Sequence, residues 1–183
     1  MEKIKELEIL AGIVDDLKRQ GKKVVQCHGC FDIVHFGHIQ HFIEAKKEGD
    51  ILIVTVTPDR FVKKGPDRPL FKEDVRLQVI AALDSVDYVA LNRWETAVET
   101  IKMLKPNIYV KGREVLDNLN VDVIRNGDMQ VSNLSSEEEA VKSVGGRLHL
   151  TDVISFSSSK IINELSTILP DETKIFIKDY KKE

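Results

Sequence analysis

The amino-acid sequence predicts an α/β fold of the doubly wound type, in which helices cover both faces of a mostly parallel sheet. Two features of the sequence indicate this class. Short β-branched runs alternate with helical patterns along most of the chain, and right-handed crossovers between such strands give parallel pairing. The run from residue 51 to residue 56 is almost entirely apolar, which is typical of a strand covered on both faces.

The elements follow one another regularly from the N-terminus. Apolar residues at helical spacing begin at Ile4, and Gly21 ends this first helix, because glycine commonly terminates helices. Strands are then predicted at residues 24–27, 51–56, 86–91, 107–110 and 147–150. Helices are predicted between and after them, at residues 37–47, 73–83, 95–104, 137–144 and 158–165.

One stretch interrupts the alternation of strands and helices. Asn126-Gly127 separates two short β-like segments at residues 121–125 and 128–131, and Asn-Gly is the strongest two-residue signal for a hairpin. We therefore predict a β-hairpin over residues 121–131, inserted between a strand and the next helix.

The chain divides into three parts by these patterns. Residues 1–21 are expected to form an N-terminal helix packed on the domain, residues 22–168 the domain itself, and residues 169–183 a C-terminal tail. The tail carries Ile175, Phe176, Ile177 and Tyr180, and large apolar residues are poorly placed on a free solvated segment. We expect the tail either to fold back on the domain or to dock on a partner.

Composition excludes several classes of protein. A net charge of −3, with 42% hydrophobic and 31% charged residues, is typical of a soluble globular protein and argues against bulk electrostatic binding of nucleic acid or anionic membrane. No apolar run approaches the roughly 20 residues that span a bilayer, and the N-terminus lacks a secretory pattern. Two cysteines form no disulfide framework, so we expect a cytoplasmic protein without nucleic-acid or membrane partners.

Histidines and cysteines cluster in one short segment. Four of the five histidines fall within fourteen residues, beside both cysteines: His28, His35, His38 and His41, with Cys27 and Cys30. Three kinds of site are compatible with such a cluster. It can be a zinc site that uses the C-x-x-C spacing, a thioredoxin-like redox motif, or a phosphate site at a junction of strand, loop and helix.

The local pattern favours the phosphate site. His35 and His38 flank Gly37 where a helix is predicted to begin, and a helix N-terminus offers unpaired N–H groups and a positive dipole end. Gly29 and Gly37 let the backbone approach a ligand closely. A thioredoxin-like motif opens its helix directly, whereas Phe36 lies nine positions after Cys27. We interpret both cysteines as packing residues, and His28 and His41 as surface or packing histidines.

The segment from Gly29 to His38, GCFDIVHFGH, resembles the G-x-F-D-x-x-H-x-G-H signature of the cytidylyltransferase-like nucleotidyltransferases. Further markers of that family follow in its order and span residues 24–165: the VTVTPD run at 54–59, the lysine loop with Arg68-Pro69, Arg76, Lys111-Gly112, and the serine run at 157–159. The pattern is most similar to heptose 1-phosphate adenylyltransferases, followed by glycerol-3-phosphate cytidylyltransferases. The resemblance implies a Rossmann-like fold.

The resemblance also implies a reaction, namely transfer of a nucleoside monophosphate from an NTP to a phosphorylated sugar or polyol with release of pyrophosphate. Catalysis of this kind depends on positioning and on stabilising phosphate charge. The implied catalytic residues are His35, His38 and Lys63. The implied nucleotide-binding residues are Gly29, Cys30, Phe31, Asp32, Gly37, Lys64, Arg76, Lys111, Gly112, Ser157, Ser158 and Ser159.

Cofactor and partners follow from the same resemblance. Mg²⁺ is expected to enter with the NTP and to sit on the phosphates, so no metal site on the protein is expected. Homodimers are usual in the resembling families. Some relatives join this domain to a sugar kinase that makes the acceptor phosphate, which implies a partner kinase here.

Details of the sequence divide between the two nearest patterns. Residues 152–155 lack the arginine that cytidylyltransferases carry before their serine or threonine run, which favours ATP over CTP. In contrast, Arg113-Glu114 departs from the heptose-type K-G-x-D pattern, and Trp94-Glu95 is similar to the cytidylyltransferases. A glycerol-3-phosphate-type cytidylyltransferase and a non-catalytic nucleotide-binding domain therefore remain as alternatives.

Overall fold

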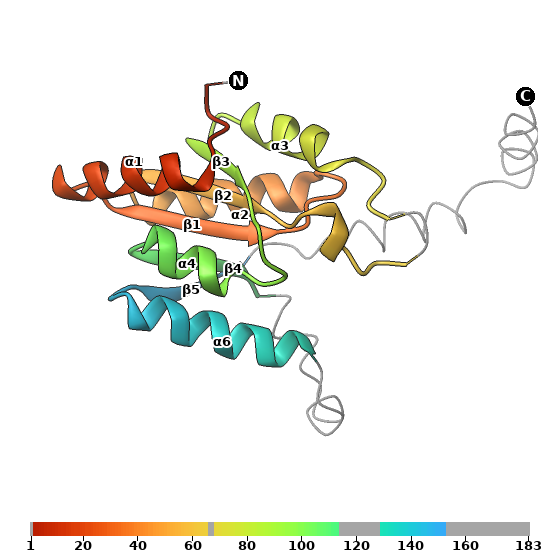
Figure 1. The fold of residues 1–183 in the computed structure, drawn as a ribbon. Helices are drawn as coiled ribbons and strands as arrows, with labels where there is room; N and C mark the ends of the chain where they lie inside the picture. Colours follow the sequence, from red (N-terminus) through yellow and green to blue (C-terminus); the bar gives the residue numbers. More distant parts are fainter. Residues whose placement is uncertain (1, 66–67, 114–128, 153–183) are drawn as a thin grey trace, which may run out of the picture.

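Five parallel strands form the centre of the structure, a computed structural model that describes residues 2–65, 68–113 and 129–152, and helices lie on both faces (Figure 1). The doubly wound α/β prediction is confirmed. The strands are β1 (Val24–Gly29), β2 (Ile51–Val56), β3 (Tyr88–Leu91), β4 (Ile108–Gly112) and β5 (Arg147–Thr151). The helices are α1 (Leu7–Arg19), α2 (Phe36–Lys47), α3 (Glu73–Ala81), α4 (Val98–Leu104) and α6 (Met129–Ser143), with a 3-10 turn η1 (Asp59–Phe61).

Two apolar layers hold the helices to the sheet, because successive strand residues point to opposite faces. On one face, α2 and α3 pack on residues such as Val25 and Val54. On the other face, α1 and α4 pack on Val24 and Ile53, while α4 and α6 enclose Tyr109. Figure 1 shows α1, α4 and α6 together on this second face.

The order of the strands defines where a ligand is expected. The sheet has the order β3-β2-β1-β4-β5, so the chain moves outward from β1 to β3 and then returns to the other side of β1. The direction of winding thus changes between β1 and β4. In open α/β sheets, ligands bind beyond the carboxyl ends of the strands at this switch point, which here is the loop after β1 and the end of β4.

The hairpin prediction is wrong for residues 129–131, which form the first turn of α6 instead of a strand. The helix begins eight residues before the predicted start at residue 137. Helix formation is cooperative, so the residues that follow extend the helix over the last three residues of the β-like segment 128–131. The rest of the predicted hairpin, including Asn126-Gly127, lies outside the described residues.

One helix starts later than its pattern predicts. The sequence predicts a helix from residue 95, whereas α4 begins at Val98. The residues before α4 form a turn in which the side-chain amide of Asn92 donates hydrogen bonds to the carbonyl oxygens of Trp94 (2.7 Å) and Thr96 (2.8 Å). This local hydrogen bonding competes with helix formation.

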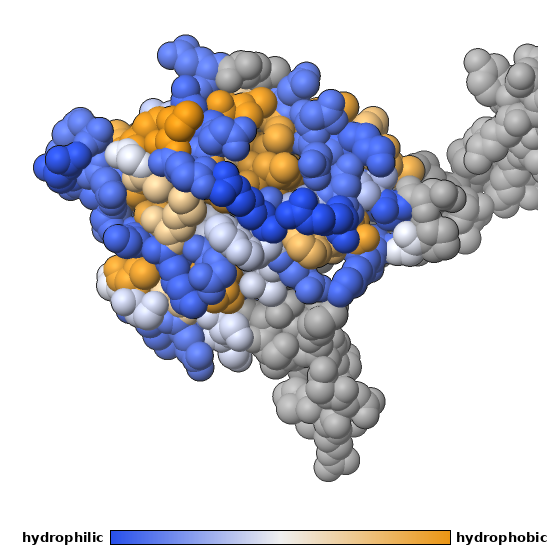
Figure 2. Space-filling model, in the orientation of Figure 1, coloured by the Kyte–Doolittle hydropathy of each residue, from blue (hydrophilic) through white to orange (hydrophobic). Residues whose placement is uncertain are grey.

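The surface of the described residues is mixed in polarity. Figure 2 shows that hydrophilic residues cover much of the face that carries α1, α4 and α6, and that apolar residues gather mainly around β3 and between α1 and α3. In the part of the chain that the structure describes, no helix combines the length and apolar character required to cross a membrane.

Candidate active site

The loop between β1 and α2 is shaped by the close packing of Phe31. The backbone of Phe31 is left-handed, with φ of 49°, and its ring packs against Phe42 and the edge of His38. A Cβ atom at Gly29 would lie 2.9 Å from the Phe31 ring, closer than side chains approach one another. Glycine at position 29 therefore makes room for Phe31, and Phe31 in turn supports the ring of His38.

His35 and His38 lie together at the N-terminus of α2. His35 is the N-cap residue, and its backbone N–H donates to Nδ1 of His38 at 3.4 Å. The two rings stack with centroids 3.8 Å apart and planes 27° from parallel. The first turn of α2 contains no acidic residue, so the positive end of the helix dipole is not neutralised by its own side chains. This is the arrangement expected of a phosphate site.

Both histidines are neutral at physiological pH. Burial lowers the pKa of His38 to about 3, with further lowering by the charges of His35, His41 and Lys64. Burial also lowers the pKa of His35, and the Lys64 charge adds to this effect. A neutral imidazole carries one N–H donor and one acceptor nitrogen. Each ring can therefore donate one hydrogen bond to a phosphate oxygen while it stays uncharged.

The two lysines of the loop after β2 lie in different environments. Lys63 forms an exposed ion pair with Glu95. In contrast, the charge of Lys64 adds to the lowering that burial causes in the pKa values of His35 and His38, and it partly offsets the rise that burial causes in the pKa of Cys30. The sequence assigns Lys63 to catalysis and Lys64 to nucleotide binding. The structure brings Lys64 to the histidine pair and leaves Lys63 paired at the surface.

Asp32 anchors the same loop from beneath. Its side chain is fully buried, and Oδ1 accepts the backbone N–H groups of Leu70 (2.7 Å) and Phe71 (3.2 Å). Its other oxygen lies 2.7 Å from Nε of Arg68. The resemblance assigns Asp32 to nucleotide binding, whereas these contacts support a role as an anchor of the loop.

Arg76 is a buried clamp between loops. Its side chain has no exposed surface, and its guanidinium donates to the carbonyl oxygens of Phe71, Cys30 and Thr57 and to the carboxylate of Asp59. Because its donors are occupied by protein oxygens, this geometry favours a scaffolding role over direct contact with a nucleotide.

Lys111 and Gly112 lie at the carboxyl end of β4, on the opposite side of the switch point from the histidines. The ammonium of Lys111 forms an ion pair of 2.8 Å with Glu137 on α6. Nearby, Nδ1 of His41 lies 2.7 Å from the hydroxyl of Thr151 at the end of β5. Sequence reasoning missed Glu137, because it falls in a run of three glutamates at 137–139 that is typical of a solvated helix face. It also missed the position of His41 at the site.

In the described part of the chain, the cluster has the geometry of neither a zinc site nor a thioredoxin-like redox motif. Within residues 2–65, 68–113 and 129–152, no group of three or more His, Cys, Asp or Glu side chains is arranged to hold a metal ion. Cys27 is buried, and burial raises the pKa of its thiol far above the ordinary value. The two ring nitrogens of His28 lie within 3.0 Å and 3.2 Å of the hydroxyls of Thr55 and Thr57. The predicted serine run at 157–159 lies outside the described residues.

Several known proteins are similar to this chain in amino-acid sequence. A family model described as cytidylyltransferase-like matches residues 26–164. The bifunctional protein HldE of Geobacter metallireducens is 37% identical over 166 residues, which are 89% of this chain and 31% of that protein. The protein of the same name from Gluconobacter oxydans is 40% identical over 155 residues, 84% of this chain and 29% of that protein. The chain thus spans about a third of the length of these curated relatives.

Solved structures with the same fold are also known. The lipopolysaccharide core biosynthesis protein from Thermoplasma volcanium superposes with a TM-score of 0.55 at 26% identity, over 75% of this chain and all of that one. Pantoate-beta-alanine ligase from Francisella tularensis gives a TM-score of 0.54 at 17% identity, over 90% of this chain and 78% of that one. The second likeness shows the fold alone.

Proposed function

Because the chain belongs to the cytidylyltransferase-like family of nucleotidyltransferases, we propose that it transfers AMP from ATP to a heptose 1-phosphate-like sugar phosphate. An oxygen of the acceptor phosphate attacks the α-phosphorus of ATP, the bond from that phosphorus to the bridging oxygen breaks, and pyrophosphate leaves. The products are a nucleoside diphosphate sugar and pyrophosphate.

The observation that carries the proposal is the stacked, neutral pair of His35 and His38 at the mouth of α2. The pair lies at the switch point of the sheet, and the charge of Lys64 acts on both rings. In an in-line displacement, negative charge grows on the α-phosphate oxygens and on the leaving bridge. Donors fixed in a partly buried site stabilise that charge without reorganising.

We assign roles to these residues accordingly. His35 and His38 donate hydrogen bonds to the α-phosphate and to the oxygen that leaves with pyrophosphate, together with the backbone N–H groups at the start of α2. Lys64 and Lys111 balance the charge of the remaining phosphates. The serines at 157–159 are proposed to bind the β- and γ-phosphates, as the family resemblance implies.

The substrate is proposed to be the Mg²⁺ complex of ATP. The histidine pair is surrounded by imidazole, ammonium and backbone N–H groups, which suit phosphate oxygens, whereas Mg²⁺ takes oxygen ligands. Asp32 is engaged by Arg68 and by two backbone amides, so it does not offer a carboxylate to a metal ion. The ion would therefore be held by the phosphates themselves.

The choice of acceptor rests on the similarity to the HldE proteins and on the heptose-type pattern of the sequence. These relatives are named bifunctional proteins, and this chain matches about a third of their length. We propose that a sugar kinase supplies the acceptor phosphate. Both cysteines of the chain are free thiols, as in proteins of a reducing compartment, which supports action in the cytoplasm.

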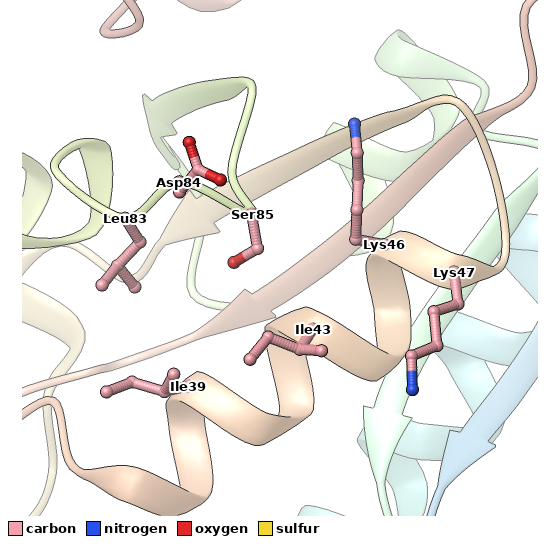
Figure 3. Close-up of a pocket in the computed structure, with 7 residues that line it drawn as sticks. All are labelled: Ile39, Ile43, Lys46, Lys47, Leu83, Asp84 and Ser85. Atoms are coloured by element: carbon pink, nitrogen blue, oxygen red, sulfur yellow. The ribbon is translucent and has the colours of Figure 1, made fainter.

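We further propose a homodimer formed through α2 and α3. Exposed large apolar side chains gather on these helices and on the loop before α3: Phe36, Ile39, Ile43, Leu70, Phe71, Val75 and Val79. Ile39 and Ile43 point from α2 toward Leu83 across a groove of about 460 Å³ (Figure 3). Lysines and an aspartate border the groove, so a two-fold related copy can pair charge with charge over an apolar centre.

The test is release of pyrophosphate from a panel of NTPs crossed with phosphorylated sugars and polyols. We expect ATP with a heptose 1-phosphate to give the highest turnover, and His35→Ala and His38→Ala each to lower turnover by roughly 10²-fold or more. His149→Ala, which replaces a partly exposed histidine in the middle of β5, is the matched control and should retain activity. Nucleotide binding without pyrophosphate release from any pair would establish the non-catalytic alternative, and a preference for CTP with glycerol 3-phosphate would establish the cytidylyltransferase.

A further inference from the structure

Lys111 and Tyr109 point to the same side of β4, because they are two residues apart on one strand. That side faces α6, where Tyr109 packs against Ala140 and Val141. One turn earlier on α6, Glu137 is placed to reach the end of the strand, and its Oε2 lies 2.8 Å from Nζ of Lys111. The ion pair thus connects α6 to a residue of the candidate active site.

This ion pair is largely removed from solvent. The side chain of Lys111 is 19% exposed and that of Glu137 only 4%. Charges taken out of water carry a large desolvation cost, and a buried pair is often no more stabilising than apolar residues of the same size. The pair therefore has no evident advantage for stability alone.

The charge of Lys111 also affects titratable groups near the site. It adds to the lowering that burial causes in the pKa values of His28 and His41, and it partly offsets the rise that burial causes in the pKa of Cys27. The charge of Lys111 thus acts on two imidazoles while its ammonium is paired with the carboxylate of Glu137. Since an ammonium carries three N–H donors, binding to Glu137 leaves donors for a phosphate oxygen.

Tyr109 also contacts the ammonium of Lys111 and limits its movement. Nζ of Lys111 lies 5.6 Å from the centroid of the Tyr109 ring, within the range of a cation–π contact. Burial and the neighbouring charge of Glu137 raise the pKa of Tyr109 well above its ordinary value, so the ring stays uncharged. A lysine side chain is flexible and loses considerable rotamer freedom when it is fixed. Glu137 and Tyr109 fix it before a substrate arrives.

We propose that Glu137 is a positioning residue that holds the ammonium of Lys111 toward the phosphates of the bound nucleotide. The inference rests on the proposed function, because it requires a polyphosphate at this edge of the sheet. Glu137 itself does not contact the reacting atoms. Its effect is to remove the entropy cost of ordering Lys111 from the catalytic step, as is general for groups that are pre-organised by their surroundings.

The variant Glu137→Gln tests positioning, because weaker positioning of Lys111 and a more positive site have different effects on kcat and KM. The variant keeps the shape of the side chain but weakens the bond to Lys111 and removes a negative charge from the site. We expect kcat to fall by about tenfold, the scale of a lost hydrogen bond to a charged group. The KM for ATP should stay the same or fall, because the site becomes more positive toward an anion. Because a partly unfolded preparation also shows a lower apparent kcat at an unchanged KM, kcat is expressed per ATP-binding site, counted by calorimetry.

The matched control lies on the same helix. Glu138 forms an exposed ion pair of 2.7 Å with Lys142, so Glu138→Gln removes an equal charge one residue away. This control should change neither kcat nor KM by more than about twofold, since exposed pairs contribute little. Glu137→Asp keeps the charge on a shorter side chain and should recover part of the lost kcat.

A double-mutant cycle with Lys111→Met decides whether Glu137 acts through Lys111. If it does, adding Glu137→Gln to Lys111→Met should have almost no further effect on kcat or on the dissociation constant of ATP measured by calorimetry. Additive effects in the cycle, or a Glu137→Gln variant with wild-type kcat, would overturn the proposal. Failure of the proposed function is distinct, because then the unmodified protein would release no pyrophosphate at all.

Discussion

His28 shows how a single buried residue connects the site to the stability of the protein. Its ring lies between two threonine hydroxyls at the end of β1, and burial lowers its pKa to about 3. Burial likewise lowers the pKa of His41 to about 4. In the unfolded chain a histidine titrates near pH 6.5. Between that pH and about pH 4, the unfolded state therefore binds more protons, and the free energy of unfolding decreases as the pH falls.

We expect His28→Gln to flatten this dependence. Each histidine kept neutral in the folded state contributes a slope of up to about 1.4 kcal/mol per pH unit in that range, and glutamine does not titrate. Urea unfolding at several pH values between 4 and 6.5 measures the slope. His149→Gln, which replaces a less buried imidazole, is the control. A slope in His28→Gln equal to that of the unmodified protein would contradict the expectation.

The two loop lysines give a second prediction at the scale of single residues. Because the Lys64 charge reaches the histidine pair, we expect Lys64→Ala to lower kcat/KM by roughly 10- to 100-fold. Lys63→Ala removes only an exposed pair with Glu95 and should change kcat/KM by no more than about threefold. Steady-state pyrophosphate release measures both variants. The reverse ranking would restore Lys63 to the catalytic role that the sequence assigns to it.

At the scale of elements, Arg76 connects α3 to the loops around the site. It donates to oxygens from the β1–α2 loop, from the residues after β2 and from the loop before α3. Arg76→Met would leave these oxygens and the carboxylate of Asp59 without their partner. Breaking a buried charge pair costs about 3–5 kcal/mol, so we expect a clear drop in the melting temperature.

Arg76→Lys tests whether the fork of the guanidinium is required. One ammonium cannot reach the oxygens that the planar guanidinium contacts, so this variant should also melt well below the unmodified protein. Thermal melting followed by circular dichroism measures both variants. If Arg76→Lys retained the original melting temperature but bound ATP less tightly, the nucleotide-binding role that the sequence predicts for Arg76 would be supported instead.

Most elements were predictable because their apolar periodicity is strong. The run at residues 51–56 is β2 with the same bounds, and the histidine motif fixes the junction of β1 and α2. The predicted helix boundaries are wrong where local side-chain hydrogen bonds or neighbouring residues determine the start of a helix. The hydrogen bonds of Asn92 delay α4, and α6 extends over a weak β-like pattern. The ion pair of Glu137 with Lys111 joins positions 26 residues apart, and sequence spacing carries no signal for such a contact.

At the scale of the whole molecule, the apolar face on α2 and α3 determines the expected assembly. Ile43 and Val79 are 37% and 42% exposed, and neither contributes to the site. We expect Ile43→Glu and Val79→Glu each to convert a dimer into a monomer, because a buried unpaired carboxylate is costly at an interface. Multi-angle light scattering measures the mass in solution. Ile9→Glu is the matched control, since Ile9 is 58% exposed on α1, on the other face of the sheet.

A dimer that persists in both variants, with Ile9→Glu dissociating instead, would place the interface on α1. Pyrophosphate release by the monomeric variants separates assembly from catalysis. Phe36 directly follows His35 and is 56% exposed, so a face that includes Phe36 borders the histidine pair. Lower turnover in a well-folded monomer would indicate that the second copy supports the site.

The pairing between β1 and β4 gives the sheet a seam at the site itself. β1 and β4 share three residue pairs, whereas β1 shares six with β2, and β4 shares five with β5. The sheet thus consists of two halves, β3-β2-β1 and β4-β5, which are joined by the shortest run of paired residues in the sheet. The histidines lie on the first half and Lys111 lies on the second. A polyphosphate that contacts both halves would bridge them and stabilise their contact. Separation of β1 from β4 and binding of the nucleotide are then mutually exclusive. A bound nucleotide should therefore lower the rate of local opening at this pairing and raise the free energy of unfolding of the domain.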